Sequence, residues 1–209
     1  MTARDRILTR IRRAAEGQSP PEPQRLKPSI ARTEGAAAVD QFIAKAQAQD
    51  TTVTRLSSID DLPAALADEL RKRNLPAAIR TGSDPIFDRD WGTIERSTGP
   101  GRIEEPATLT RAELGLAETG ALALSSGPDN PVTLNFLGET HFAVIDASTI
   151  VGGFEDLWAR WRELGLNPRT LNLISGPSRS ADIGQTLQLG AHGPVALHIF
   201  IVGASEPLP

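Results

Sequence analysis

Two apolar segments near the carboxyl end place the strongest constraint on how this chain folds. They are LNLIS at residues 171–175 and VALHIFIV at residues 195–202, and aliphatic or aromatic side chains fill most of both. A strand that is apolar along its whole length is typical of a sheet covered on both faces, as parallel α/β sheets are. The sequence therefore predicts a core sheet with other elements packed on either side of these two strands.

Helical and strand-like segments alternate along the rest of the folded part. Residues 33–49 and 60–72 have helical patterns, and each precedes a short β-like segment, TTVTRL and PAAIR respectively. Later in the chain the expected elements are strands at 121–125, 140–147, 171–176 and 195–202, a helix at 154–164 and a short helix from about Ser180. This alternation predicts the α/β class, with a mostly parallel sheet flanked by helices.

The first 29 residues are expected to form an arm ahead of a single domain at residues 30–209. Apolar residues recur at helical spacing near the start, with arginines on the other positions: Ile7, Leu8, Ile11, Ala14 and Ala15 against Arg4, Arg6, Arg10, Arg12 and Arg13. The segment SPPEPQRLKP then holds four prolines and reads as an extended tether. Such a basic helix suits an anionic membrane, a nucleic acid, its own domain or a partner subunit.

Composition excludes several classes of function. The formal net charge of −4 argues against a general nucleic-acid binder, and no apolar run is long enough to cross a membrane, so the cytoplasm is the expected location. The chain contains no cysteine, which excludes disulfides, thiolate nucleophiles and iron–sulfur clusters held by cysteines of this chain. We predict no cofactor on this chain, and any redox carrier would sit on another protein.

The segment SGPSRSADI, which follows LNLIS, is a candidate anion site. Ligands of open α/β sheets usually lie at the carboxyl ends of strands, beside helix N-termini. Gly176 would form the turn, Ser178 or Ser180 would cap the helix with Asp182 in its first turn, and Arg179 would offer a planar fork of donors. The alternative is structural: the same residues cap a helix while Arg179 pairs with a nearby acid.

Other candidate residues are His192, in LGAHGP, and Glu118, in AETGALAL. His192 precedes a Gly-Pro turn and could act as a base or bind an anion, or it could simply hold the turn. Glu118 at a glycine turn could be a nucleophile or base, or an ordinary exposed residue. His198 is expected in the core and His141 at the start of a strand. Histidines scattered in this way predict no zinc site, and no GxSxG motif supports a hydrolase.

Three motifs in order resemble the lactate-utilisation (LUD) domain, and specifically the lactate utilisation protein C family. They are AETGALALSSGPDNPVTLNFLGETHFAVI, ISGPSRSADI and LGAHGPVALHIFIV, over about residues 115–202. The resemblance implies a fold like that of the NagB/RpiA/CoA-transferase superfamily. It also implies a cytoplasmic role in oxidising L-lactate to pyruvate, together with partner proteins that carry cysteine-rich and iron–sulfur elements.

The family motifs also imply site residues. Glu118 and His192 are the candidate catalytic residues, and no metal ligand is predicted. The residues carried over as candidate ligand-binding positions are Thr119, Gly120, Ser175, Gly176, Ser178, Arg179, Ser180, Asp182 and Gly193; Pro177, Ala181, Ile183 and Pro194 complete the motifs. Two positions depart from the family pattern, because Ser180 replaces the usual Thr and Gly184 replaces the usual Glu.

Two functions remain open from the sequence, and a third is a module with a vestigial pocket. The first is an auxiliary subunit of a lactate-oxidising system that binds a small anionic ligand and docks iron–sulfur partners. The second is a free-standing enzyme acting on a sugar phosphate or acyl-thioester, with Glu118 as base or nucleophile, Arg179 holding the anion and His192 assisting. The Gly184 replacement bears on this choice, since it removes a carboxylate from the motif.

Overall fold

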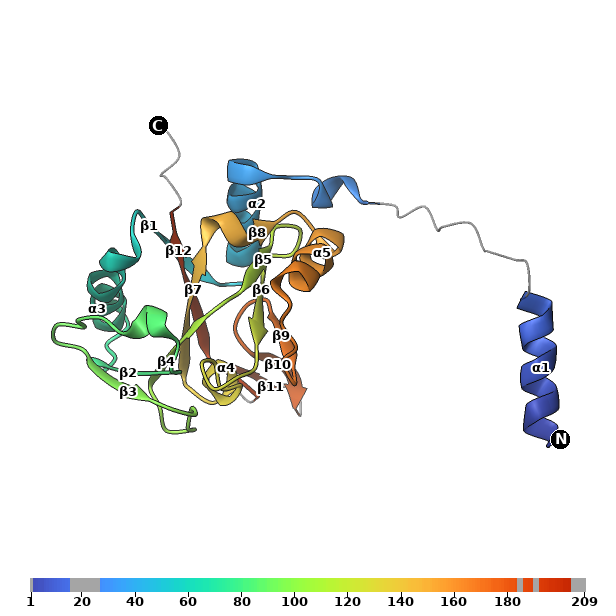
Figure 1. Cartoon of the computed structure of the whole chain (residues 1–209). Coiled ribbons are helices and arrows are strands. Elements are labelled where there is room, and N and C mark those ends of the chain that lie inside the picture. The colour runs from blue at the N-terminus through green and yellow to red at the C-terminus, as the bar shows by residue number, and fades with distance from the viewer. Residues whose placement is uncertain (1, 16–26, 184–185, 190–191, 204–209) are drawn as a thin grey trace.

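A six-stranded parallel sheet forms the centre of the molecule. The computed structural model describes residues 2–15, 27–183, 186–189 and 192–203. The strand order is β1-β12-β7-β4-β2-β3, and every neighbouring pair is parallel (Figure 1). The strands are β1 (Thr52–Leu56), β2 (Ala78–Thr81), β3 (Glu95–Thr98), β4 (Ala107–Arg111), β7 (Thr140–Asp146) and β12 (Ala196–Val202). The predicted α/β class with a mostly parallel sheet is confirmed.

Helices cover both faces of this sheet. On one face, α3 (Leu62–Lys72) inserts Leu62, Leu66 and Leu70 against Phe200 of β12 and neighbouring strands. On the other face, α2 (Gly35–Gln47) packs against the alternate side chains of β12. The two-residue period of the strand thus divides the apolar run of β12 between two cores. His198, on the α3 side, is buried as expected, with 2% of its surface exposed.

A second, four-stranded sheet packs on the α2 side of the first. Its order is β8-β5-β6-β9, with β8 (Ile150–Val151), β5 (Leu114–Leu116), β6 (Ala121–Ser125) and β9 (Leu171–Ile174). Leu122 and Leu124 of β6 face the parallel sheet, while Ala121 and Ala123 pack with Leu157 of α5 (Phe154–Leu164) on the outside. The layers therefore run from α3 through two sheets to α5 (Figure 1).

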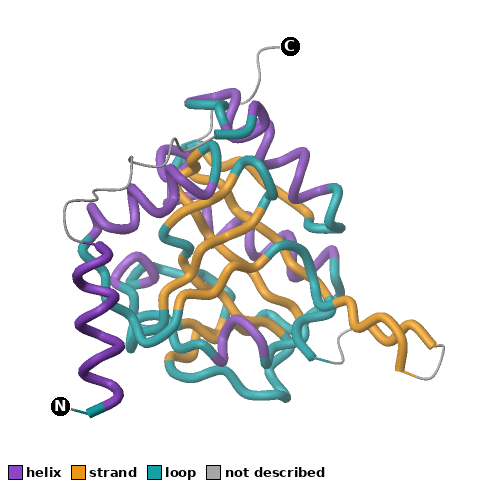
Figure 2. The backbone as a smooth tube through the Cα atoms, turned by 90° about the vertical axis from the view of Figure 1, so that its right-hand side faces the viewer, coloured by secondary structure: helices purple, strands orange, loops and turns teal. Residues whose placement is uncertain are grey.

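Two predictions about the SGPSR region are wrong. LNLIS forms β9, an edge strand antiparallel to β6, and Leu173 is 41% exposed, so this strand is not buried in the core sheet. The short helix expected from Ser180 is a hairpin of β10 (Arg179–Ile183) and β11 (Thr186–Leu189), which stands out from the body (Figure 2). The alternation in TLQL has the period of a strand. Gly184 lies outside the described residues.

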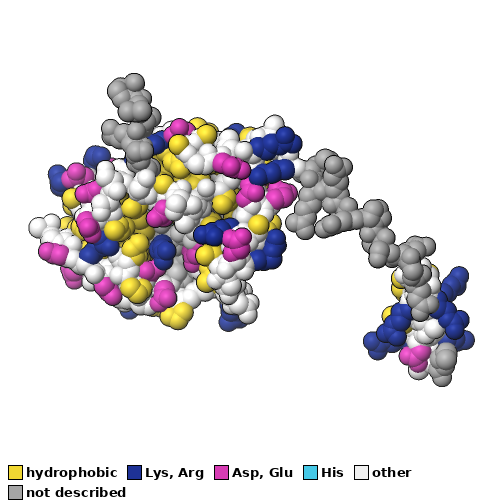
Figure 3. Space-filling model, turned by 45° about the horizontal axis from the view of Figure 1, so that its top comes forward, with side chains coloured by type: hydrophobic (Ala, Val, Ile, Leu, Met, Phe, Trp, Pro, Cys, Tyr) yellow, Lys and Arg dark blue, Asp and Glu magenta, His cyan; other side chains and the backbone are white. Residues whose placement is uncertain are grey.

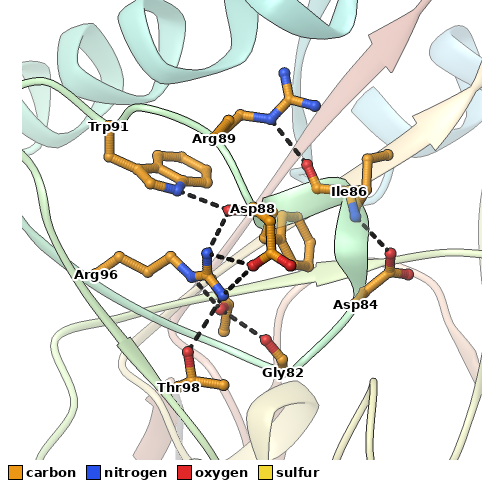
Figure 4. A network of polar contacts seen from close by, with 10 residues as sticks. Gly82, Asp84, Ile86, Asp88, Arg89, Trp91, Arg96 and Thr98 are labelled. Atoms are coloured by element: carbon orange, nitrogen blue, oxygen red, sulfur yellow. Dashed lines mark hydrogen bonds and ion pairs between the residues drawn. The ribbon is translucent and has the colours of Figure 1, made fainter.

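The turn-rich middle of the chain is ordered by a polar network around Arg96 (Figure 4). The Arg96 guanidinium donates to the carbonyl of Phe87, to the Asp88 carboxylate and to the hydroxyl of Thr81. These contacts tie β3 to the loop that follows β2, which contains the short 3-10 helix η3 (Pro85–Phe87). The remaining short elements are η1 (Ser29–Ala31), η2 (Ile59–Asp61), α4 (Thr133–Phe136) and η4 (Ala147–Thr149).

The first residues form the expected amphipathic helix, α1 (Ala3–Ala15), and none of its residues is buried. Basic side chains project on both sides of this helix in the space-filling view (Figure 3). The predicted Pro-rich tether falls mainly on residues 16–26, outside the described residues, and Lys27 already contacts the body through Asp156. Among the described helices, none combines the length and apolar character that a membrane span requires.

Candidate functional site

A cleft of about 230 Å³ opens beside the end of β9 and the turn at residues 192–194. Its floor includes His141 and Leu197, each the second residue of its strand, β7 and β12. The cleft therefore lies toward the amino ends of these parallel strands. The expectation that this site lies at the carboxyl ends of the parallel strands is wrong, because β9, which leads into SGPS, belongs to the other sheet.

Two of the predicted motifs meet in this cleft. Five of the predicted residues line it: Ser175, Gly176, Ser178, His192 and Gly193. The backbone N–H of Ser178 donates to the carbonyl of Pro194 at 2.9 Å. A Cβ atom on Gly193 would lie only 3.2 Å from the Cβ of Ser178, so the SGPS and HGP segments pack closely. They form one wall, and their role in ligand binding remains a prediction.

Glycines let the ETG and SGP turns approach the end of α2. Gly120 has a φ of +71°, and a Cβ there would lie 2.3 Å from the backbone nitrogen of Ala46. Gly176 has a φ of +80°, and its Cβ would lie 2.5 Å from the carbonyl oxygen of Gln49. Only glycine combines these backbone angles with so little room. The Ser175 hydroxyl, which donates to the Thr119 carbonyl at 3.2 Å, joins the two turns.

Glu118 and Arg179 lie away from the cleft. The Glu118 N–H donates to the carbonyl of Gly152 at 3.0 Å, and its Oε2 would lie 2.9 Å from a Cβ placed on Gly153. The carboxylate is therefore beside the first turn of α5. The Arg179 guanidinium pairs with Asp50, as the structural alternative expected. Because Ser180 and Asp182 lie in β10, the prediction that they cap a helix is wrong.

Asn135 and His141 are site residues that sequence reasoning missed. Both line the cleft, and each is only 1% exposed. Three of their polar atoms have no hydrogen-bond partner among the described residues: Oδ1 and Nδ2 of Asn135, and Nδ1 of His141. Buried polar groups are almost always paired, so two buried side chains with unpaired polar atoms beside one cleft indicate a place for a polar ligand. The signal available in the sequence was a polar residue inside each of two apolar runs, TLNF and THFAVI.

The hydrogen bond between His141 and Thr110 bears on which ring nitrogen of His141 carries the proton. Its Nε2 lies 2.7 Å from Oγ1 of Thr110, which is also buried. Burial lowers the pKa of His141 to about 4, so the ring is neutral at neutral pH. The Thr110 hydroxyl has no other partner in the described part of the chain, so it donates to Nε2. We therefore assign the proton to Nδ1, which is left as an unpaired donor.

The remaining walls are apolar, and the rim carries one imidazole. Leu173, Ile174, Leu197 and Phe136 line the cleft, and no described lysine or arginine does. His192 is exposed at its edge. Among the described residues, no three His, Cys, Asp or Glu side chains lie close enough together to hold a metal ion. The described lining thus offers neutral donors, one amide acceptor and apolar contacts, which suit a small organic molecule better than a bare metal ion.

Comparison with known proteins assigns the family. The family model of the LUD domain matches residues 106–202. A lactate utilization protein C of Halalkalibacterium halodurans is 30% identical over 172 residues, which cover 72% of this chain and 73% of that protein. This chain belongs to the lactate utilization protein C family of LUD-domain proteins. Every described residue that lines the cleft falls inside the LUD-domain match.

Other relatives match this LUD domain over a shorter span. An uncharacterized protein of Neisseria meningitidis is 40% identical over 98 residues, 46% of this chain and 42% of that protein. A lactate utilization protein C of a Geobacillus species is 38% identical over 45% of this chain and 41% of its own length. A crystal structure of a DUF162 family protein from Deinococcus radiodurans has a TM-score of 0.62 at 23% identity, covering 82% of this chain and 99% of that one, which shows a shared fold.

Proposed function

We propose that this LUD-domain protein serves lactate utilisation by binding L-lactate, or the pyruvate formed from it, in the cleft beneath the SGPS and HGP turns. The observation that carries the proposal is a pair of buried side chains with unpaired polar atoms, the amide of Asn135 and the Nδ1 of His141, beside a cleft of about 230 Å³. Its relatives in Halalkalibacterium and Geobacillus, named lactate utilization protein C, supply the ligand class.

The chemistry of the cleft fits a small hydroxy or oxo acid. A carboxylate accepts hydrogen bonds, and the Nδ1–H of His141 and the amide NH₂ of Asn135 are unpaired donors. The Oδ1 atom of Asn135 is an unpaired acceptor that a 2-hydroxyl group can satisfy. Leu173, Ile174 and Leu197 provide apolar contacts for a methyl group. The exposed imidazole of His192 lines the rim of the cleft and can donate a further hydrogen bond to the anion.

We further propose that the protein acts as a cytoplasmic subunit beside proteins that carry iron–sulfur and cysteine-rich elements. Oxidation of lactate releases two electrons, and a chain without cysteine holds no cysteine-ligated cluster to accept them. The exposed amphipathic helix α1 supplies a surface for such partners. Affinity purification of the tagged protein from its host during growth on L-lactate tests this part; absence of any iron–sulfur protein from the eluate contradicts it.

Calorimetric titration with L-lactate tests the ligand. We expect Asn135→Asp to weaken binding by about tenfold or more, because it replaces an amide donor with a like charge beside the carboxylate. Asn74→Asp, on an exposed turn, is the matched control and should leave affinity unchanged. His192→Ala changes only the rim and should weaken binding with the melting temperature retained. If wild-type protein binds neither L-lactate nor pyruvate, the proposed ligand is wrong.

Growth of the host on L-lactate tests the cellular role separately. Deletion of the gene should impair growth on L-lactate, and the wild-type gene should restore it, whereas Asn135→Asp should not. Glu118→Gln examines the enzyme alternative in the same assay. Because the Glu118 carboxylate lies beside α5 and not in the cleft, we expect that variant to restore growth. Failure of Glu118→Gln, with the protein folded and able to bind lactate, would instead support a catalytic Glu118.

A further inference from the structure

A second, larger cleft lies at the carboxyl end of the parallel sheet. Its volume is about 500 Å³, and its lining includes Asp84, Arg111, Glu113, Ser125 and Asn130. Arg111 is the last residue of β4, and Ser125 is the last residue of β6. No described residue lines both this cleft and the cleft of Asn135 and His141. The function proposed above leaves this second cleft without a role.

The cleft lies at the point where the strand order of the parallel sheet reverses. β2 and β4 are neighbours, but the next strand of this sheet after β2 is β3, on one side, and the next after β4, beyond β5 and β6 of the other sheet, is β7, on the other side. The loops that follow these two strands therefore diverge, and Asp84 and Arg111 stand at their starts. Crevices of this kind are where open α/β sheets usually bind ligands. The topology alone thus marks this edge as a binding site.

The walls of the second cleft are held in place before any ligand arrives. Ser83 donates to the carbonyl of Pro128 at 3.1 Å and to the Asp129 carboxylate at 3.0 Å, which joins the loops after β2 and β6. A Cβ on Gly82 would lie 1.8 Å from the carbonyl oxygen of Asp129, so these loops touch along their backbones. Asp84 accepts the N–H of Ile86 at 2.9 Å (Figure 4). Preorganised walls lower the cost of binding.

Two lining residues have acceptor atoms without donors. Asn130 is 7% exposed; its Nδ2 donates to the carbonyl of Ser125 at 3.0 Å, but its Oδ1 has no partner among the described residues. Glu113 accepts the Ser125 hydroxyl at Oε1, while its buried Oε2 has no described partner. Burial raises the pKa of Glu113, although the Ser125 hydrogen bond and the charge of Arg111 act in the opposite sense. A ligand with hydrogen-bond donors and a positive charge would pair the two free acceptor atoms and stabilise the buried Glu113 carboxylate.

The other charges define the opposite end of such a ligand. Arg111 is half-exposed, with a distant contact of 3.4 Å to Asp84, so its guanidinium keeps donors for a further acceptor. An apolar wall is formed by the last residue of α5, Leu164, and by Leu166 and Pro168 in the segment that follows it. We propose that this cleft binds a small molecule of the α-amino acid class, with its ammonium at Glu113 and Asn130 and its carboxylate at Arg111. The side chain of the amino acid lies against the apolar wall.

A screen of the twenty common α-amino acids by saturation-transfer NMR tests this proposal on the full-length protein. The affinity of any binder is then measured by calorimetry. We expect Glu113→Gln to weaken binding by about tenfold or more, because a charged hydrogen-bond partner of the ammonium is lost while the Ser125 contact is kept. Glu104→Gln removes the same charge from an exposed position and is the matched control. Arg111→Gln should weaken binding of the amino acid, but it should not weaken binding of the corresponding amine that lacks the carboxylate.

Leu166→Arg provides a variant that does not disturb the buried carboxyl. Leu166 is 40% exposed, so the substitution should fold, and its positive charge should prevent an ammonium from entering. Binding to no amino acid by the wild-type protein, or equal binding by wild type and Glu113→Gln, overturns the proposal. Binding that Leu166→Arg does not affect also overturns it. L-lactate affinity should be the same in Glu113→Gln as in wild type, so this proposal and the lactate proposal fail independently.

Discussion

The Nε2 atom of His141 lies 2.7 Å from the hydroxyl oxygen of Thr110, and this hydrogen bond joins two neighbouring strands of the parallel sheet. Thr110→Val removes the donor and leaves Nε2 unpaired in the core. We expect the free energy of unfolding to fall by about 1–3 kcal/mol, as for other buried polar groups that lose a partner. Thr110→Ser keeps the hydroxyl and should lose less. Urea unfolding measures both, and equal losses in the two variants would show that packing rather than the hydrogen bond dominates.

Lactate affinity should follow the same contact. In Thr110→Val no hydroxyl donates to Nε2, so the His141 proton is no longer held on Nδ1. The hydrogen-bond donor that Nδ1 offers to a carboxylate is then not fixed. We expect weaker L-lactate binding in Thr110→Val than in Thr110→Ser. Nitrogen-15 NMR of the histidine ring reports the tautomer directly, and a wild-type spectrum with the proton on Nε2 would refute the assignment.

The free energy of unfolding should decrease as the pH falls below the pKa of an ordinary histidine. Burial lowers the pKa of His141 from 6.5 to about 4, so the unfolded chain takes up a proton that the folded chain excludes. The stabilisation is complete above pH 6.5 and is lost as the pH falls toward about 4, by up to about 3 kcal/mol for such a shift. His141→Gln should reduce this dependence of the urea midpoint, and His198, whose pKa burial also lowers to about 4, should account for the part that remains.

The turn at Gly176 should tolerate no side chain. Gly176→Ala places a Cβ 2.5 Å from the Gln49 carbonyl oxygen at a φ of +80°. Gly92→Ala is the control, because its φ is +58° but nothing lies within 4 Å of the added Cβ. The control should lose about 1 kcal/mol from the backbone angle alone, and Gly176→Ala should lose more. A smaller loss at Gly176 than at Gly92 would mean that the end of α2 moves aside.

Removal of residues 1–15 should leave the rest of the protein as stable as before. No residue of α1 is buried, although Ile7 and Ile11 are 60% and 58% exposed apolar side chains. Loss of an unpacked helix removes little buried surface. Calorimetric melting of the shortened and full chains compares them. A clear drop in the melting temperature would indicate that the helix packs against the body in solution.

The sequence predicted the sheet because its signal is local. The continuous apolar run of β12 and the helical patterns of α2, α3 and α5 identify these elements within a few residues. The hairpin β10–β11 was predicted as a helix because Ser and Asp near a Gly-Pro pair are favoured both at helix caps and in turns. The alternation of polar and apolar residues in TLQL spans only four residues, which is too short to outweigh those capping signals.

The site was predicted less completely, because it depends on which strands become neighbours. The SGPS and HGP motifs meet in one cleft, but the end of the sheet at which they meet follows from the antiparallel placement of β9. Asn135 and His141 draw attention only through their missing partners, which is a property of the packed core. The crevice at Arg111 likewise requires the strand order before it can be recognised.

The pairing of β1 with β12 has a consequence for how the protein is made. Thr52 and His198 lie opposite each other in the sheet, and their side chains are joined by a hydrogen bond across 146 residues of sequence. On the ribosome, β1 therefore emerges long before its only neighbour in the sheet. Contacts so distant in sequence slow folding and leave a strand edge exposed meanwhile. Synthesis must reach almost the last described residue before the central sheet can close, so premature termination anywhere upstream of β12 should yield an aggregation-prone chain.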